Sequence, residues 1–325
     1  MGGEKTMEKM RIQDTELWVS PFGLGTADAG VAWKEEDAES IFGTYLELGG
    51  NVIDTAHVYS DWVPPEIARS ERVIGDWLAK TKKRSEIVLV TKGGHPSMLG
   101  EKPDMHKSRM QREDMTADLD SSLMKLRTDY IDLYFYHRDD VTIPVEETIE
   151  VMEEFVRQGK IRYYGCSNWS PERMKAADAY CREKGYRGFI ADEMLFNYGT
   201  KYMNPMEDDT LGIMDDAMYQ YHSENRRNLA MPYMGICSGF FHSYEKKGAE
   251  AVKMSPYYTE GNLQAAKRLE ELKEKYGANT TQILLGFFTV QDFPCLPLYG
   301  TGKPERLKEA ADAFSIPFEK ADFEK

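Results

Sequence analysis

The sequence predicts a (β/α)8 TIM barrel, an α/β fold built as a single domain. Short apolar runs rich in β-branched and aromatic residues occur eight times along the chain. Amphipathic stretches with apolar residues at helical spacing separate most of these runs. No linker, low-complexity tract or break in composition divides the 325 residues. Regular alternation of strands and helices is typical of a parallel sheet covered by helices.

The predicted strands are nearly continuous apolar runs, as expected of parallel strands covered on both faces. They span residues 17–25, 51–56, 86–92, 130–137, 161–168, 188–195, 228–235 and 295–300. The predicted helices span residues 35–49, 70–80, 112–127, 145–160, 170–185, 262–277 and 303–314. Ser170-Pro171 is typical of an N-cap followed by proline in the first helical turn. The glycines that close LELGG and YCREKG are typical of C-caps.

A doubly wound sheet is the competing architecture. A G-x-G-x-x-G motif does not follow the first predicted strand, so the phosphate loop of a Rossmann fold is missing from the sequence. The segment MRIQDTELWVS, residues 10–20, alternates weakly and is predicted to form an N-terminal β-hairpin over the barrel floor. We expect residues 1–10 to form a flexible leader and residues 11–325 to form the barrel.

Composition limits the partners. The net charge is -14 and no block of Lys or Arg occurs, which argues against a nucleic-acid partner. The sequence has no apolar run of the ~18 residues that a transmembrane helix needs and no secretory signal. The cysteines, four in number, show neither C-x-x-C nor metal-site spacing. We expect a reduced, cytoplasmic protein with a small-molecule partner, no membrane contact and no metal site.

Polar residues recur where the predicted strands end. Asp54 lies at the end of the second strand, Lys92 ends the third and His137 ends the fourth, while Tyr59 lies in the loop after the second. Functional residues of such barrels gather at the C-terminal ends of the strands. We therefore expect these side chains to meet around one mouth.

These residue types suit proton transfer to a carbonyl oxygen. A phenol has a pKa near ~10, and a nearby ammonium lowers it. A carboxylate keeps that ammonium charged in a dry site. A histidine donates a hydrogen bond to a developing oxyanion. Together they predict a device that protonates a carbonyl oxygen as hydride reaches the carbon, or the reverse.

The chain resembles the aldo-keto reductase family across roughly residues 11–314. The motifs are NVIDTAHVYS, SERVIGDWL, VTKGG, DYIDLYFYH, YYGCSN and GTGKPERL, in the family's order. The resemblance implies a barrel that binds NADP(H), or in some members NAD(H), without a Rossmann fold. It implies Tyr59 as general acid or base, Lys92 as the modulator of its pKa, Asp54 as the partner of Lys92 and His137 as the group that orients substrate.

The resemblance also implies a cofactor site. Ser167 and Asn168 would bind the nicotinamide carboxamide, and Tyr233 would stack on the nicotinamide ring. Glycines and a helix start in GTGKPERL suit an anion, and the family places the adenosine 2′-phosphate there, which favours NADP(H) over NAD(H). The full predicted set is Thr26, Ser167, Asn168, Glu193, Tyr233, Gly300, Thr301, Lys303 and Arg306.

Three positions depart from the family pattern. The usual Asn-Gln of the sixth strand is replaced by Asp192-Glu193; a carboxylate accepts from the carboxamide but cannot donate to it. Such a carboxylate also attracts the positively charged oxidised nicotinamide. Residues 234–236 read Met-Gly-Ile instead of Ser-Pro-Leu, and Glu309-Ala310 replaces Glu-Asn. NAD(H) therefore stays open as the alternative cofactor.

Aromatic and basic residues of the predicted mouth loops are candidates for substrate contact. They are Trp33, Trp62, His95, Arg138 and Trp169. A mouth that combines tryptophans with polar groups suits a sugar-like or polyol-like substrate.

We predict an NAD(P)(H)-dependent oxidoreductase that moves hydride between nicotinamide and an aldehyde or ketone, or the matching alcohol. Two other functions stay open. One is a nucleotide-binding regulatory subunit that senses redox state with little turnover. The other is a metal-dependent isomerase or lyase on a similar barrel, which needs carboxylates and histidines clustered at strand ends. His137 is the only histidine that ends a predicted strand.

Overall fold

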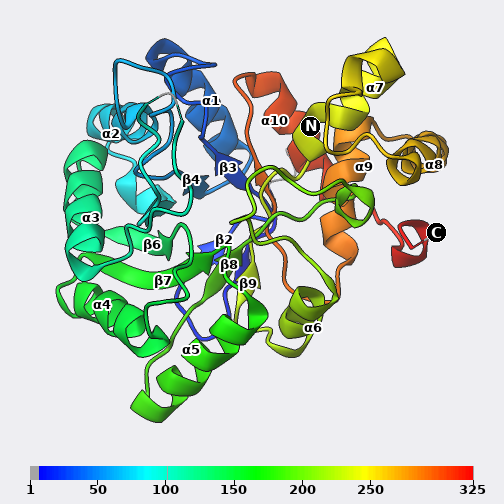
Figure 1. Ribbon diagram of the computed structural model, residues 1–325. Helices are drawn as coiled ribbons and strands as arrows, with labels where there is room; N and C mark the ends of the chain where they lie inside the picture. Colours follow the sequence, from blue (N-terminus) through cyan, green and yellow to red (C-terminus); the bar gives the residue numbers. More distant parts are fainter. Residues whose placement is uncertain (1–6, 101, 325) are drawn as a thin grey trace.

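The computed structural model describes residues 7–100 and 102–324 and shows a closed parallel barrel wrapped by helices (Figure 1). A bridge between Ala230 and Cys295, just before the last strand, closes the ring. The predicted (β/α)8 barrel is confirmed. Its strands, in spatial order, are β10 (Leu298–Tyr299), β3 (Gly23–Gly25), β4 (Val52–Asp54), β5 (Val88–Gly93), β6 (Ile131–Tyr136), β7 (Ile161–Ser167), β8 (Ala191–Glu193) and β9 (Leu229–Ala230).

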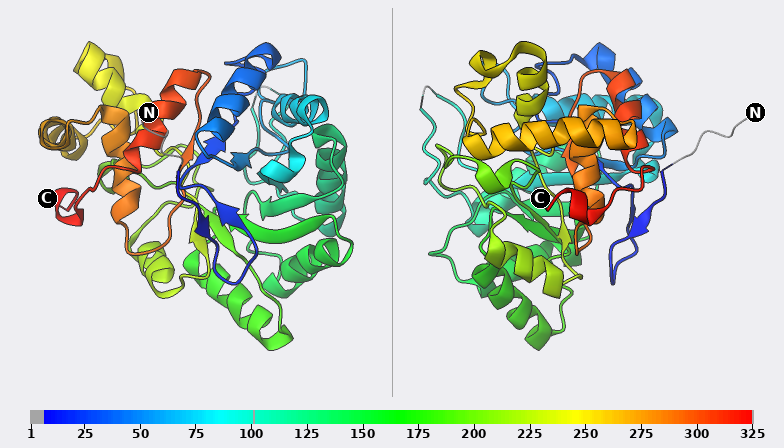
Figure 2. Two further views of the ribbon diagram at one scale, coloured as in Figure 1. Left: turned by 180° about the vertical axis from the view of Figure 1, so that it is seen from behind. Right: turned by 90° about the vertical axis from the view of Figure 1, so that its right-hand side faces the viewer.

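Helices follow the strands and cover the outside of the barrel (Figures 1 and 2). They are α1 (Glu35–Glu47), α2 (Arg69–Thr81), α3 (Arg112–Leu126), α4 (Val145–Arg157), α5 (Pro171–Lys184), α6 (Asp216–Glu224), α7 (Phe240–Lys247), α8 (Glu260–Tyr276), α9 (Thr280–Gly286) and α10 (Pro304–Ala313). Short 3-10 turns are η1 (Arg84–Glu86), η2 (Thr200–Tyr202), η3 (Cys237–Gly239), η4 (Ala249–Val252), η5 (Phe287–Val290) and η6 (Lys320–Asp322). None of the helices in the described part of the chain has the length and apolar character needed to cross a membrane.

The first predicted strand, residues 17–25, is divided between two sheets. Its beginning is β2 (Trp18–Val19), which pairs antiparallel with β1 (Met10–Arg11), and only its end is barrel strand β3. Pro21, which cannot donate a ladder hydrogen bond, separates the two pieces. The predicted hairpin is thus present, and it crosses one end of the barrel when the molecule is seen from behind (Figure 2).

The N-terminal leader was expected to end at residue 10. Met10 is already part of β1, and the Met7 amide donates to the Leu48 carbonyl at 3.1 Å. The remainder of the predicted leader, residues 1–6, lies outside the described residues. The division into a leader and a barrel domain stays a prediction.

The region after the seventh barrel strand differs from the predicted helix pattern. The predicted helix 262–277 is α8, and it lies outside α9, which packs against α10 (Figure 1). The sequence pattern did not indicate α6, α7 or α9. Helix α9 is buried on nearly every side, and three of its seven residues are Thr or Gln, so its sequence lacks a helical hydrophobic period. Its start carries a capping box between Asn279 and Gln282.

Alternate residues of each strand face the barrel interior. Val52, Val88 and Val90 join an apolar cluster inside the barrel, while Ile53 and Leu89 join the cluster between strands and helices. Hairpin residues Ile12, Leu17 and Val19 belong to the interior cluster and close its floor. The same alternation directs Asp54 and Lys92 inward, at the end of each strand that lies away from the hairpin.

Candidate active site

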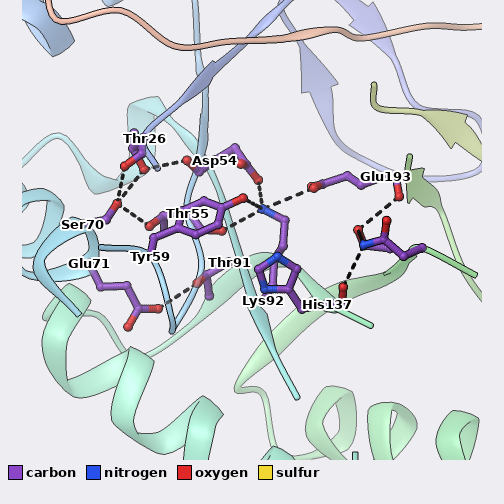
Figure 3. A network of polar contacts seen from close by, with 12 residues as sticks. Thr26, Asp54, Thr55, Tyr59, Ser70, Glu71, Thr91, Lys92, His137 and Glu193 are labelled. Carbon is purple, nitrogen blue, oxygen red and sulfur yellow. Dashed lines mark hydrogen bonds and ion pairs between the residues drawn. The ribbon is translucent and has the colours of Figure 1, made fainter. Parts of the chain in front are cut away.

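Lys92 lies at the centre of a buried polar network (Figure 3). Its Nζ donates to Asp54 Oδ2 at 2.6 Å, to the carbonyl oxygen of Thr55 at 2.9 Å and to Tyr59 Oη at 3.2 Å. An ammonium has three hydrogens, so these acceptors take all of them. The predicted group of Asp54, Tyr59 and Lys92 is brought together by β4, the loop after it and the neighbouring strand β5.

The charges of this network offset the cost of burying an ammonium. Burial lowers the pKa of Lys92, but attraction by Asp54 and then Glu193 outweighs it, so the pKa ends above its ordinary value. Burial raises the pKa of Asp54, and attraction by Lys92 opposes this. Lys92 is therefore held as an ammonium.

Tyr59 is a protonated phenol in this structure. Burial raises its pKa above the ordinary value of 10.0, and the attraction of Lys92 compensates only in part. Burial of the phenol outweighs the ammonium, although Lys92 acts on the pKa of Tyr59 in the expected, lowering direction. The ring is edge-on to Trp62 at 6.3 Å and to His137 at 5.6 Å between centroids.

Hydroxyl groups behind the strands fix the loop that carries Tyr59. Ser70 Oγ, on α2, lies 2.7 Å from the hydroxyls of both Thr26 and Thr55 (Figure 3). Thr26 Oγ1 also donates to the Asp54 carbonyl oxygen at 2.7 Å. The hydroxyl of Thr26, a predicted cofactor ligand, thus holds β3, β4 and α2 together, although the residue also lines the cavity described below.

His137 and His95 stand side by side with ring centroids 4.5 Å apart. Burial, together with His95 and Lys92, lowers the pKa of His137 well below its ordinary value. Burial and Arg138 lower the pKa of His95 to about 4, and its Nδ1 contacts the Pro96 carbonyl oxygen at 2.7 Å. Both rings are neutral near pH 7, and His137 Nδ1 has no partner among the described residues.

The two acidic residues that replace the family's Asn-Gln lie on opposite faces of strand β8. Glu193 points inward, with Oε2 3.3 Å from Lys92 Nζ. Asp192 points outward, where Oδ2 lies 3.1 Å from His222 Nε2 on α6. Only Glu193 therefore belongs to the site. Burial and then repulsion by Asp54 raise the pKa of Glu193 well above its ordinary value.

Asn168 joins several segments around the mouth. Its Nδ2 donates to the His137 carbonyl oxygen and to Ser167 Oγ, each at 3.0 Å. Its Oδ1 accepts from the Gly212 amide at 2.9 Å and from Tyr233 Oη at 2.7 Å. These bonds use the full capacity of an amide side chain. Asn168, a predicted carboxamide ligand, acts here as the anchor of Tyr233, and a ligand would have to replace one of these bonds.

A cavity of about 330 Å³ opens beside Tyr59. Its volume is typical of small-molecule sites. It unites many of the predicted residues: Thr26, Trp33, Asp54, Tyr59, His137, Arg138, Ser167, Glu193, Tyr233, Gly300 and Thr301. Arg138 also pairs with Asp208 at 2.9 Å. Trp62 lies beside Tyr59, His95 lies beside His137, and the exposed Lys303 and Arg306 lie at the start of α10.

Trp169 is not a pocket residue. It is fully buried in the core between strands and helices, edge-on to Phe189, with Nε1 donating to the Arg138 carbonyl oxygen at 3.2 Å. The reason is the preceding residue, Asn168, whose φ of 64° turns the chain away from the mouth. The prediction that Trp169 contacts substrate is therefore wrong.

At the exit of the first barrel strand the sequence predicted Thr26 but not Gly25, Ala27 and Asp28, which also line the cavity. Two contacts in the cavity wall need small residues. A Cβ on Gly300 would lie 3.0 Å from the Gly25 carbonyl oxygen, and one on Gly302 would lie 2.9 Å from Trp33 Cβ. Glycines at the exits of neighbouring strands β3 and β10 were the available signal. Within residues 7–100 and 102–324, His, Cys, Asp and Glu do not gather in groups of three that could hold a metal.

Known proteins resemble this chain over most of its length. The family model described as the Aldo/keto reductase family matches residues 21–325. An aldo-keto reductase of Bacillus subtilis is 28% identical over 94% of this chain and 88% of its own length. Norsolorinic acid reductase A of Aspergillus parasiticus is 30% identical over 92% of this chain and 74% of its own. An aryl-alcohol dehydrogenase [NADP(+)] of Phanerodontia chrysosporium is 27% identical over 91% and 75%. The chain therefore belongs to the aldo/keto reductase family and is a nicotinamide-dependent oxidoreductase.

Proposed function

We propose that the protein transfers hydride between NADP(H) and an aldehyde or ketone, or the matching alcohol, with Tyr59 as proton donor or acceptor. One observation carries the proposal. The Tyr59 hydroxyl lies 3.2 Å from Lys92 Nζ, and its ring lines the same cavity as His137. A proton carrier and a neutral hydrogen-bond donor thus face one small-molecule space, and a buried cation contacts the proton carrier.

The cavity residues fit a nicotinamide cofactor. Glu193 lines the cavity, and its Oε1 is buried and has no hydrogen-bond partner among the described residues. At the other end, the N-terminus of α10 favours an anion. Lys303 and Arg306 are exposed there and make no ion pair within the described part of the chain. Two free cations beside a helix start suit a 2′-phosphate, which supports NADP(H) over NAD(H).

The bound cofactor supplies or accepts the hydride, and the chain handles the proton. In carbonyl reduction the O–H bond of Tyr59 breaks and its proton passes to the carbonyl oxygen. Lys92 stabilises the phenolate that remains, and it stays an ammonium because Asp54 lies 2.6 Å away. The neutral His137 donates a hydrogen bond to the same carbonyl oxygen. In alcohol oxidation the proton moves in the opposite direction.

For the substrate, we propose an aromatic aldehyde or alcohol first. Several relatives are named aryl-alcohol dehydrogenase or norsolorinic acid reductase. In this chain Trp33 lines the cavity and Trp62 lies beside Tyr59. A sugar or polyol is the second class. Arg138 lines the cavity while paired with Asp208, which leaves guanidinium hydrogens for substrate hydroxyls.

The test is titration of the purified protein with NADPH and NADH, followed by quenching of tryptophan fluorescence. A screen of aromatic aldehydes, aromatic alcohols and polyols follows. We expect tighter binding of NADPH than of NADH and turnover of at least one class. A regulatory subunit that senses redox state would bind nucleotide tightly yet turn over none of them. Failure of both nucleotides to bind would sink the proposal.

A further inference from the structure

Glu193 is buried beside a cation that has no hydrogen to give it. Its Oε2 lies 3.3 Å from Lys92 Nζ. The three hydrogens of that ammonium already serve Asp54, the Thr55 carbonyl and Tyr59. Its Oε1 has no partner among the described residues. An ionised carboxylate without a donor is costly to bury, whereas a neutral carboxyl group is much less so.

Lys92 is the cation nearest to Glu193, and it also pairs with the carboxylate of Asp54. Asp54 lies nearer to Lys92 than Glu193 does, 2.6 Å against 3.3 Å. Both carboxyl groups are almost wholly buried. Two ionised carboxylates beside one ammonium would leave an uncompensated negative charge inside the barrel. Asp54 has the hydrogen bond, so Glu193 is the group that keeps a proton.

The other groups around Glu193 do not change this assignment. Tyr59 and Tyr233 are phenols whose pKa values burial raises, so both are uncharged. His137 and His95 are neutral because burial lowers their pKa values. Arg138 lines the cavity, but its charge is paired with Asp208. Ser167, on the neighbouring strand β7, uses its hydroxyl on the Glu193 main-chain carbonyl.

We propose that Glu193 is a neutral acid in the free protein and releases its proton when the oxidised, positively charged nicotinamide binds in the cavity. The O–H bond of the carboxyl group breaks, the electron pair stays on the carboxylate and the proton goes to solvent. The inference rests on the proposed function, because it requires a nicotinamide in this cavity. A cation brought to the unpartnered Oε1 supplies the charge compensation that Lys92 cannot.

Binding of NADP+ then releases about one proton, whereas binding of NADPH releases none through this residue. Affinity for NADP+ rises with pH, by up to about tenfold per unit. Affinity for NADPH does not follow this slope. Alcohol oxidation releases one proton, so a rise in pH already favours it. The proton lost from Glu193 adds to this effect and shifts the bound nucleotide further from NADPH toward NADP+.

The test is calorimetric titration of each nucleotide at one pH in phosphate, HEPES and Tris, whose ionisation enthalpies differ. The dependence of the observed heat on buffer enthalpy gives the number of protons released. We expect a difference of nearly one proton between NADP+ and NADPH in the wild-type protein. We expect that difference to vanish in Glu193→Gln with binding of both nucleotides retained. Asp192→Asn, the neighbouring carboxyl that faces α6, should keep the wild-type difference.

NADPH is the internal control, because it carries the same 2′-phosphate as NADP+ and any proton that this phosphate releases cancels in the difference. Infrared difference spectra give a second readout. The C=O stretch of a protonated carboxyl should disappear when NADP+ is added, and Glu193→Gln should lack this change. Equal proton release for the two nucleotides, or a difference that persists in Glu193→Gln, would overturn this inference alone. Failure of the wild-type protein to bind either nucleotide would overturn the proposed function with it.

Discussion

Lys92 and Asp54 form an ion pair that bridges neighbouring strands inside the barrel. Nζ and Oδ2 are 2.6 Å apart, with 0% and 2% of the two side chains exposed. In the β4–β5 register Asp54 lies opposite Val90, so Lys92 is the next inward-facing residue along β5. The register of the two strands therefore brings Asp54 and Lys92 together. The pair lies between the apolar barrel interior and the mouth. Glu193 lies on its other side, 3.3 Å from Lys92 Nζ.

This arrangement predicts unequal stability losses for the two partners. Lys92→Met leaves Asp54 and Glu193 buried without a cation, and we expect the free energy of unfolding to fall by about 3–5 kcal/mol. Asp54→Asn leaves Lys92 beside Glu193, and we expect a loss of about 1–3 kcal/mol. Urea unfolding at pH 7 measures both. Lys80→Met, which removes an exposed pair with Glu39, is the control and should cost less than about 1 kcal/mol. A larger loss for Asp54→Asn than for Lys92→Met would contradict this account.

Tyr59→Phe separates proton transfer from nucleotide binding. The change removes one hydroxyl, which accepts from Lys92 at 3.2 Å, and keeps the ring between Trp62 and His137. We expect kcat to fall by about 100- to 10,000-fold, the usual contribution of a general acid. The Kd for NADPH should change less than about twofold. Tyr180→Phe on α5, which removes a hydroxyl bonded to Glu150, should leave both values unchanged. Full turnover by the Tyr59 variant would refute the mechanism.

The site residues at the strand ends could be predicted from the sequence. A barrel points every second residue of a strand inward and brings the C-terminal ends of its strands together at one mouth. To locate Asp54, Lys92 and His137 it was enough to know roughly where each strand ends and which alternate residues point inward. Glu193 was predicted as a cofactor residue and Asp192 was not, and in the structure Glu193 faces Lys92 while Asp192 faces His222. Local pattern alone was therefore enough to find the centre of the site.

Other features depend on contacts between distant segments. Trp169 follows a strand exit as His137 does, yet the left-handed conformation of Asn168 sends it into the core. That conformation is held by bonds to Gly212 and Tyr233, far along the chain. The pKa of Tyr59 could not be predicted from a nearby lysine, because its direction depends on how deeply the phenol is buried.

Cofactor preference should depend on the start of α10. Lys303 and Arg306 are exposed there and make no ion pair among residues 7–100 and 102–324. Replacing both by Ala removes two charge-assisted contacts, each worth about 1.5–3 kcal/mol when made to a phosphate. We expect the Kd for NADPH to rise at least about tenfold while the Kd for NADH changes little. Lys308→Ala, further along the same helix, is the control. Equal weakening of both nucleotides would assign these residues to the shared part of the cofactor instead.

The paired histidines predict how stability depends on pH. His95 has an ordinary pKa of 6.5 and a pKa lowered to about 4 in the folded protein, because burial and Arg138 disfavour its charged form. Between these values the unfolded chain binds more protons, so stability rises with pH and is fully present above pH 6.5. It is lost as the pH falls toward 4, by up to about 3 kcal/mol for this residue. Urea unfolding from pH 7 to pH 4 should show a shallower loss in His95→Asn than in the wild-type protein. His106→Asn, a change at an exposed histidine, should keep the wild-type slope. Identical slopes for the two variants would show that His95 is not buried as a neutral base.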